Sequence, residues 1–358
     1  MGIIRLLLAF AVFNSHFPFF EGTTLVNGHE AVLTFFAISG FYMALILDRS
    51  YSDARSFYWS RFLTLYPMYA LAVVISLGLL TSLDVSSMTN RASLRAILAD
   101  PAAFLIMAWT TATTIGQELL FSLTLSPQGG LHFTAYSHDA LWTDAPLIQT
   151  WSLSLEATFY ALAPFLVRLR SRTLFGLLAA SLALKLAVMA SPLSGVIFFK
   201  RFFLLEFWLF AGGILAYRAH RRLPEAARWY DYGLFLVLAG MVLLSDGLPK
   251  PLLPFFLPTI ALVAMPLVFR GFKRLRFDRF AGKISYPFYL LHYIVIALFE
   301  TYAEDPEGGQ ILVAALAASI VFHFLFNPGI ESLKTKLRRR HALSVPEVGA
   351  VLQPVPMP

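Results

Sequence analysis

The chain has 358 residues, of which 58% are hydrophobic and 14% are charged, and its formal net charge is +7 at pH 7. Soluble domains are close to half apolar and a quarter charged, so this composition excludes an ordinary soluble protein. The absence of cysteine excludes disulfides, thiolate metal sites and a cysteinyl acyl-enzyme. Apolar windows long enough to cross a bilayer recur from one end of the chain to the other. We therefore predict an all-α, polytopic membrane helix bundle.

The first apolar segment, residues 3–20, contains two ionisable residues, Arg5 and His16. They are eleven positions apart. On an α-helix this corresponds to about 1100°, so both side chains lie on one face, about 16 Å apart along the axis. Ionisable residues inside a membrane are costly and mark polar pathways by default. We therefore predict a polar lane through the bundle; the alternative is a snorkelling Arg5 and a buried, hydrogen-bonded His16.

Ten membrane spans are predicted, near residues 3–20, 31–47, 65–82, 150–168, 174–190, 198–217, 230–246, 252–269, 284–300 and 309–327. Lys and Arg gather in alternate connecting segments, at 48–64, 168–172, 218–228, 270–283 and 334–340. The positive-inside rule puts these segments and both termini in the cytoplasm. This segregation explains the positive net charge, and we expect membrane lipid and no nucleic acid as a partner.

Residues 97–126 do not fit a simple crossing. They are apolar enough to span, yet their flanks, 83–96 and 116–149, are both expected outside. We therefore predict a re-entrant hairpin or two half-helices, which the bilayer allows only against protein or a cavity. The alternative is an eleventh span with one terminus inverted, which Arg91 and Arg95 disfavour.

The segment 127–149 is the longest hydrophilic stretch expected outside. It contains His132, Tyr136, His138, Asp139 and Asp144. Aromatic rings beside carboxylates suit a lid over a sugar. They suit an ordinary interfacial loop equally well, because Tyr and Trp anchor loops at the headgroup level.

Residues 1–330 are expected to form one membrane-embedded domain, in which we see no internal repeat. The remaining segment, 331–358, is basic and becomes Pro-rich and unpatterned from residue 341. Such a composition is typical of disorder, so we predict a disordered cytoplasmic tail.

Four further motifs contain residues able to do chemistry. They are Phe35-Phe36-Ala37-Ile38-Ser39-Gly40-Phe41, Arg61-Phe62-Leu63-Thr64-Leu65-Tyr66-Pro67, Trp151-Ser152-Leu153-Ser154-Leu155-Glu156 and Ile284-Ser285-Tyr286-Pro287-Phe288-Tyr289-Leu290-Leu291-His292. Ser152, Glu156 and Tyr160 are spaced i, i+4, i+8 and form one polar stripe. Glu156 is expected about 9 Å, and His16 about 6 Å, below the outer end of its span. We therefore expect these two to meet, because a carboxylate beside a histidine orients a general base; the alternative is a buried acid paired with an arginine.

Taken together and in this order, these motifs resemble the acyltransferase-3 family, the bacterial integral-membrane O-acyltransferases that modify surface glycans. The resemblance covers about residues 3 to 330. It rests on Arg5 and His16 with ten residues between them, Phe-Phe-x-x-Ser-Gly-Phe, the Tyr-Pro entry to the third span, Trp-Ser-Leu-Ser-x-Glu and Tyr-x-x-Tyr-Leu-Leu-His. One position departs from the pattern: Thr64 stands where relatives usually have the second arginine of Arg-x-x-Arg.

The resemblance implies about ten spans in the bacterial inner membrane, with both ends in the cytoplasm. It implies an acyl-CoA donor, used from the cytoplasmic side, and a carbohydrate hydroxyl as acceptor on the far side. His16 and Arg5 would fall on the essential His and Arg of the family, and Glu156 on its motif acid. No metal is expected.

We accordingly predict O-acyl transfer, with acetyl as the expected group, to an extracytoplasmic glycan or glycolipid. His16 would be the general base, since its ordinary pKa is near neutrality, and Glu156 would orient it. Arg5, Arg55 and Arg61 would hold the phosphates of the donor, because guanidinium matches phosphate geometry.

Four more residues are candidates for the polar lane: Ser39, Ser152, Tyr160 and His292. Ser39 could be a nucleophile, but we favour close helix packing of Ser39-Gly40 because no base is visibly adjacent. His292 could equally make a structural hydrogen bond.

Two other classes of function are open on the sequence. A transporter or flippase could use Arg5, His16 and Glu156 as a relay, although the inverted repeats and paired broken helices common in such folds are not seen. The second class is a non-catalytic relative that acts as a membrane scaffold. Thr64 is the only indication of it.

Overall fold

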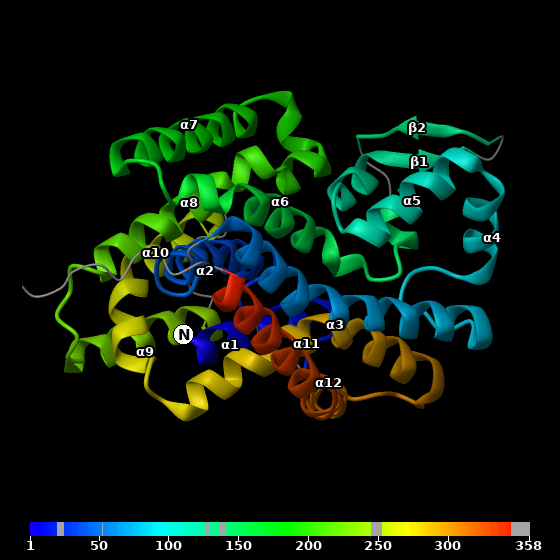
Figure 1. Cartoon of the computed structure of the whole chain (residues 1–358). Helices are drawn as coiled ribbons and strands as arrows, with labels where there is room; N and C mark the ends of the chain where they lie inside the picture. The colour runs from blue at the N-terminus through cyan, green and yellow to red at the C-terminus, as the bar shows by residue number, and fades with distance from the viewer. Residues whose placement is uncertain (20–24, 52, 127–128, 136–139, 245–252, 345–358) are drawn as a thin grey trace, which may run out of the picture.

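The computed structural model describes residues 1–19, 25–51, 53–126, 129–135, 140–244 and 253–344. Its helices are α1 (Gly2–His16), α2 (Gly28–Arg49), α3 (Ala54–Leu83), α4 (Arg91–Ala99), α5 (Pro101–Thr113), α6 (Trp151–Leu166), α7 (Ser171–Met189), α8 (Phe203–His220), α9 (Trp229–Leu243), α10 (Leu253–Phe272), α11 (Arg276–Tyr302) and α12 (Gly308–Ser344). Shorter 3-10 turns are η1 (Gln117–Ser122), η2 (Leu141–Asp144), η3 (Ile148–Thr150), η4 (Pro192–Gly195) and η5 (Ile197–Arg201). Two three-residue strands, β1 (Leu123–Leu125) and β2 (Leu131–Phe133), pair antiparallel beside α4 and α5 (Figure 1).

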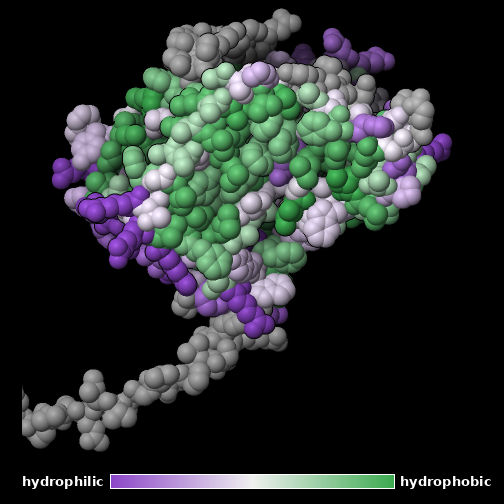
Figure 2. Space-filling model, turned by 90° about the horizontal axis from the view of Figure 1, so that it is seen from above, coloured by the Kyte–Doolittle hydropathy of each residue, from purple (hydrophilic) through white to green (hydrophobic). Residues whose placement is uncertain are grey.

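The predicted all-α membrane bundle is confirmed. Seven described helices are long and apolar enough to cross a membrane: α2, α3, α7, α8, α10, α11 and α12. Helices α1 and α9 are apolar but shorter, and α6 has 16 residues. Each predicted span coincides with one of these helices. Figure 2 shows a broad hydrophobic face with hydrophilic residues at its borders, as a surface in contact with lipid requires.

Helix α2 is surrounded by α1, α8 and α10, and its backbone lies directly against that of α8. A Cβ atom at Gly40 would be 2.2 Å from the carbonyl oxygen of Phe210, and one at Gly213 would be 2.2 Å from the carbonyl oxygen of Ala37. Neither contact leaves room for a side chain. The close approach predicted for the Ser-Gly step is therefore confirmed at Gly40, since small residues let membrane helices touch through their backbones.

Three aromatic rings pack in a row at this contact. The Phe210 ring of α8 lies between Phe36 of α2, at 4.9 Å between ring centres, and Phe159 of α6, at 4.4 Å. All three side chains are fully buried. We call Phe36, Phe159 and Phe210 the aromatic layer.

The ends of α2, α6 and α8 lie together. Arg221, after α8, is paired with Asp48 near the end of α2 at 3.0 Å. The Arg218 guanidinium donates to the carbonyl oxygen of Leu169, after α6, at 2.6 Å. The basic connecting segments that follow these helices are thus gathered at one end of the bundle, in the pattern that the positive-inside rule predicts.

Helix α1 is fixed at both ends. At its start the Ile3 N–H donates to Asp278 Oδ1 at 3.0 Å, in the first turn of α11. At its far end Ser15 Oγ accepts from the Gly28 N–H at 2.6 Å, where α2 begins. Helices α1 and α11 therefore run in the same direction, and α2 runs back alongside α1.

The predicted irregular segment 97–126 contains a sharp break. Helices α4 and α5 meet at an angle of 110°. The break is at Asp100, whose Oδ1 accepts from the N–H groups of Ala102 and Ala103 at 3.0 and 2.9 Å and so caps the start of α5. A capped break of this kind is typical of a helix that begins anew in another direction.

The far end of α5 points at other helices, which satisfy its polar backbone. Tyr69 and Tyr66 of α3 donate their hydroxyls to the carbonyl oxygens of Thr111 and Ala112 at 2.8 and 2.7 Å. Just beyond the helix, the Gly116 N–H donates to Ser154 Oγ of α6 at 2.8 Å. Irregular backbone inside a membrane requires such partners, so α5 has the local structure predicted for a re-entrant segment.

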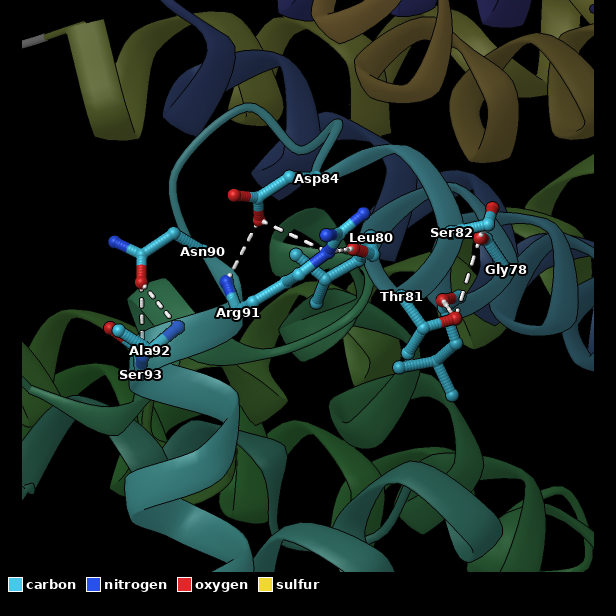
Figure 3. A network of polar contacts seen from close by, with 10 residues as sticks. Gly78, Leu80, Thr81, Ser82, Asp84, Asn90, Arg91, Ala92 and Ser93 are labelled. Atoms are coloured by element: carbon cyan, nitrogen blue, oxygen red, sulfur yellow. Dashed lines mark hydrogen bonds and ion pairs between the residues drawn. The ribbon is translucent and has the colours of Figure 1, made fainter.

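Arg91, whose charge lies on the side expected outside, has a local structural role (Figure 3). Helix α3 ends at Asp84, which has the left-handed φ of 58°. Asp84 Oδ1 accepts from the Arg91 N–H at 2.9 Å, and Arg91 Nε donates to the carbonyl oxygen of Leu80 at 3.2 Å. A basic side chain on the last carbonyls of a helix is favourable, so this arginine joins α3 to α4.

The outer segment 127–149, for which a sugar lid and an interfacial loop were equally open, is described in part. Tyr136, His138 and Asp139 lie outside the described residues. His132 is exposed on β2. Asp144 Oδ1 accepts from Thr89 Oγ1 at 2.6 Å, and burial raises the pKa of the Asp144 carboxyl. Asp144 thus holds the loop to the segment after α3 instead of presenting a carboxylate to a sugar.

Helix α12 continues to Ser344, past residue 330, where the sequence analysis ends the membrane domain. The segment 331–344, predicted as the start of a disordered tail, is therefore helical. Residues 345–358 lie outside the described residues.

The α4–α5 pair generates a topology prediction. Single cysteines replacing the exposed Met88 and His132 in this cysteine-free chain should both react with an impermeant maleimide added outside intact cells, because a re-entrant segment returns to the side it left. The control is Arg172→Cys at the start of α7, which should react only after permeabilisation. Labelling of one outer cysteine with protection of the other would mean that α4–α5 crosses the membrane.

The α2–α8 contact generates a stability prediction. Gly40→Ala should destabilise the fold by about 1–3 kcal/mol, the usual cost of overpacking, because the new methyl group meets backbone that cannot rotate away. Gly78→Ala in α3 is the control, since a Cβ there meets nothing within 4 Å. Melting temperatures of the detergent-solubilised variants measure both; equal melting temperatures would refute the close contact.

Candidate active site

All the predicted site residues except Arg55 fall into two separate groups. One surrounds a cavity of about 480 Å³ at the end where α1 finishes, α2 begins and α11 approaches its end. The other lies where α2, α3 and α6 meet. We call them the histidine cavity and the Ser39–Glu156 cluster.

His16 lines the histidine cavity and is exposed to it. It is the last residue of α1, and its Nδ1 lies 2.6 Å from the hydroxyl of Tyr293 on α11. The two rings are in contact, with 4.5 Å between their centres. Because one ring nitrogen is bonded to Tyr293, Nε2 is the nitrogen left to face a substrate.

His292 is fully buried directly behind this pair. Its ring centre lies 5.9 Å from that of His16. Its Nδ1 lies 2.9 Å from the carbonyl oxygen of Tyr289, and since a carbonyl can only accept, Nδ1 carries the proton. His292 therefore makes the structural hydrogen bond that the sequence analysis named as the alternative to lining the polar lane.

Ser152 and Gln149 attach the start of α6 to α11. Ser152 Oγ lies 2.7 Å from the Tyr289 hydroxyl, which donates to the carbonyl oxygen of Gln149 at 2.6 Å. Gln149 Nε2 donates back to the carbonyl oxygen of Leu290 at 3.0 Å. These bonds fix the cavity wall, and Ser152 is buried within them.

Glu156 belongs to the second group. Ser39 Oγ donates to Glu156 Oε1 at 2.5 Å, and the Tyr160 hydroxyl donates to Oε2 at 2.8 Å. The polar stripe is thus confirmed for Glu156 and Tyr160.

A nucleophilic Ser39 was disfavoured because no base is visibly adjacent in the sequence. That reason does not hold in the structure, because the Glu156 carboxylate is adjacent to the Ser39 hydroxyl.

The expected pairing of Glu156 with His16 is wrong. Helix α2 begins beside Ser15, next to His16, and Ser39 is eleven positions along it. Glu156, which is bonded to Ser39, therefore lies further along the bundle than His16, whose ring is bonded to Tyr293. Helix α6 starts at the histidine cavity, which Trp151 lines together with His16. The prediction failed because it used depth alone, which does not tell which neighbouring side chain Glu156 faces.

Arg5 and Arg61 lie at the depth of Glu156. The Arg5 guanidinium carbon is 6.0 Å from the centre of the Phe35 ring, one turn before Ser39. Arg61 and Tyr160 together line an apolar cavity of about 230 Å³ between α3 and α6. Thr64 donates its hydroxyl to the carbonyl oxygen of Ser60 at 2.6 Å, so this position contributes to its own helix and supplies no cation.

The third predicted arginine, Arg55, is exposed in the first turn of α3. A cavity of about 490 Å³ opens beside it, lined by Arg49, Arg168, Asp48 and Asp53 among others. From the sequence, Arg49 and Arg168 are only indications of topology. Guanidinium groups in a cavity at the basic end are suited to phosphate.

A family model described as an acyltransferase domain matches residues 2–327 of the chain. The chain belongs to the acyltransferase-3 family. It is therefore a membrane acyltransferase, and the resemblance stated from the motifs is confirmed. Searches for similar curated proteins and similar solved structures gave no match.

The site of this acyltransferase contains residues that sequence reasoning missed. Tyr293 directly follows the Tyr-x-x-Tyr-Leu-Leu-His motif and is one turn from Tyr289, which was a usable signal. Arg201 and Trp142 also line the histidine cavity. Arg201 lies near the outer end of a predicted span, where a cation departs from the positive-inside pattern. Among the described residues no group of three or more His, Cys, Asp or Glu side chains could hold a metal ion.

The His16–Tyr293 bond generates a prediction for this acyltransferase. Tyr293→Phe keeps the ring and removes only the hydroxyl, so the bundle should fold normally while His16 loses its orientation. We expect turnover to fall at least about tenfold, within the range that a positioned acid or base contributes. The dependence of kcat/KM on pH should also shift, because the partner of the imidazole changes. Tyr232→Phe, at an exposed tyrosine of α9, is the control; unchanged turnover and an unchanged pH profile in Tyr293→Phe would show that the bond has no such role.

Proposed function

We propose that the protein transfers an acyl group, with acetyl as the expected group, from acyl-CoA to a hydroxyl of an extracytoplasmic glycan or glycolipid. The observation that carries this proposal is the separation of two kinds of site along one bundle. Arginines line the basic end and its interior, and a histidine faces a cavity at the opposite end. A donor with phosphates at one end and a thioester at the other fits that separation.

The donor would enter from the basic end, which the positive-inside pattern assigns to the cytoplasm. Both termini would lie on this side, in a bacterial inner membrane. Arg49, Arg55 and Arg168 at the basic end would bind the phosphates of the donor. Arg5 and Arg61 would contact the donor further inside the bundle. Arg5 and His16 are about 16 Å apart on one helix face, which is comparable to the reach of a pantetheine arm.

We assign Glu156 to positioning the pantetheine arm of the donor, and not to orienting the general base His16. Its two carboxylate oxygens are held by the Ser39 and Tyr160 hydroxyls, so it is oriented before any substrate arrives. Preorganised polar groups of this kind bind without reorganisation cost. Glu156 would thus position the arm between Arg5 and His16.

His16 is assigned as the general base. In the tautomer whose Nδ1–H donates to the Tyr293 oxygen, Nε2 carries the lone pair that takes the proton of the acceptor hydroxyl. The hydroxyl oxygen then attacks the acyl carbonyl carbon, and the carbon–sulfur bond breaks. Acyl-CoA supplies the activated thioester. The protonated imidazole returns its proton to the departing thiolate, so the reaction balances without a metal.

The decisive experiment uses purified protein in proteoliposomes with radiolabelled acetyl-CoA and a surface-glycan extract. Release of free CoA should depend on the acceptor, and label should appear on the glycan. His16→Ala should lower transfer about 10²–10⁴-fold, the contribution of a general base, while His132→Ala, at an exposed histidine of β2, should not.

Substrate flux without cleavage of the thioester would instead identify a transporter. Normal turnover by His16→Ala would remove the assigned base. Complete absence of CoA release with every acceptor would favour the non-catalytic scaffold.

A further inference from the structure

A positive charge lies in the wall of the histidine cavity. Arg201 ends the η5 turn just before α8. Its guanidinium carbon is 4.0 Å from the centre of the Phe121 ring and 4.9 Å from that of Trp151. All three residues line the same cavity as His16. The two rings hold the guanidinium in place, since arginine stacks favourably on aromatic faces.

This guanidinium has no counter-ion within the described part of the chain. No described carboxylate lies within 4.0 Å of it, and its Nε is buried without a hydrogen-bond partner. Two other buried cations of the chain are paired: Lys185 binds Glu206 and Arg270 binds Asp231, both at 2.7 Å. A buried charge requires a partner, and Arg201 differs from these in meeting a cavity instead of a carboxylate.

A second unpartnered donor lies on the same wall. Trp142 also lines the cavity, and its indole Nε1 is buried without a hydrogen-bond partner in the described structure. The Trp142 ring stacks on Phe121, with 4.9 Å between centres and 12° between planes. Arg201, Phe121 and Trp142 thus form one stack that presents two sets of N–H donors. Such donors suit an anion that accepts several hydrogen bonds.

We propose that the acceptor is an acidic sugar, whose carboxylate binds Arg201 while one of its hydroxyls is presented to His16. This rests on the proposed function of the same cavity. A ligand with a single negative charge is favoured for two reasons. Arg201 is the only Lys or Arg among the described residues that line the cavity, and the exposed Glu300 at the same cavity would repel a second negative charge. The aromatic rings offer flat apolar surface to the sugar itself.

The test compares two probes that differ in one group. They are a uronic-acid tetrasaccharide and the same tetrasaccharide with its carboxyl groups reduced to alcohols. Binding to the purified full chain is measured by calorimetry, and acetyl transfer is measured as kcat/KM. The wild type should favour the acidic probe by at least about tenfold in both, the usual effect of a hydrogen bond to a charged group.

Variants separate charge recognition from packing. In Arg201→Gln the ratio between the acidic and reduced probes should fall toward one. Arg201→Lys should recover part of that ratio, because the charge remains without the planar fork. The matched control is Lys200→Gln, which removes the neighbouring exposed charge that does not line the cavity and should keep the ratio of the wild type.

Equal use of both probes by the wild type would overturn the proposal, and so would an Arg201→Gln variant that keeps the preference. If Arg201→Gln lowered the affinity for both probes equally, Arg201 would have only a structural role. Calorimetry distinguishes this failure from that of the proposed function. Selective binding of the acidic probe that is lost in Arg201→Gln supports the proposal even without transfer, and transfer without selectivity supports only the proposed function.

Discussion

The backbone contact between α2 and α8 fixes the position of α2, the helix that connects the two groups of site residues. Gly40 and Gly213 let the two helices touch without side chains between them, and in a membrane such packing stabilises a bundle that the hydrophobic effect cannot. Helix α2 carries Ser39 at this contact, and it begins beside His16 at the other end. A fixed α2 therefore fixes the distance between the Ser39–Glu156 cluster and the histidine cavity.

Much of the bundle could be predicted from the sequence because its causes are local. Apolar windows define spans, and arginine clusters between alternate spans define their direction. The Ser39-Gly40 step predicted close packing, and the two flanks of residues 97–126 that are both expected outside predicted a segment that does not cross simply. Arg5 and His16 could be placed on one face because a single continuous helix connects them, so only its pitch is needed.

The site could be predicted only in part, because the rest depends on which side chains of separate segments face each other. Glu156 was placed beside His16 from its depth alone. Its carboxylate instead meets Ser39 of α2, and no periodicity in the sequence reports which side chain of another helix it faces. Tyr293 and Arg201 contact the cavity through tertiary packing, which spacing along one helix does not reveal. The structure thus separates one expected centre into two.

The aromatic layer has a consequence for the bioenergetics of the cell. A membrane protein with a wet cavity at each end risks a leak of ions down the transmembrane gradient. The fully buried Phe36, Phe159 and Phe210 put closely stacked rings beside the Ser39–Glu156 cluster, between the two ends. Their surfaces cannot hydrogen-bond, so water cannot form a continuous wire along them. A proton path between the two ends would therefore have to follow polar side chains such as those of the Ser39–Glu156 cluster, and not the faces of these rings.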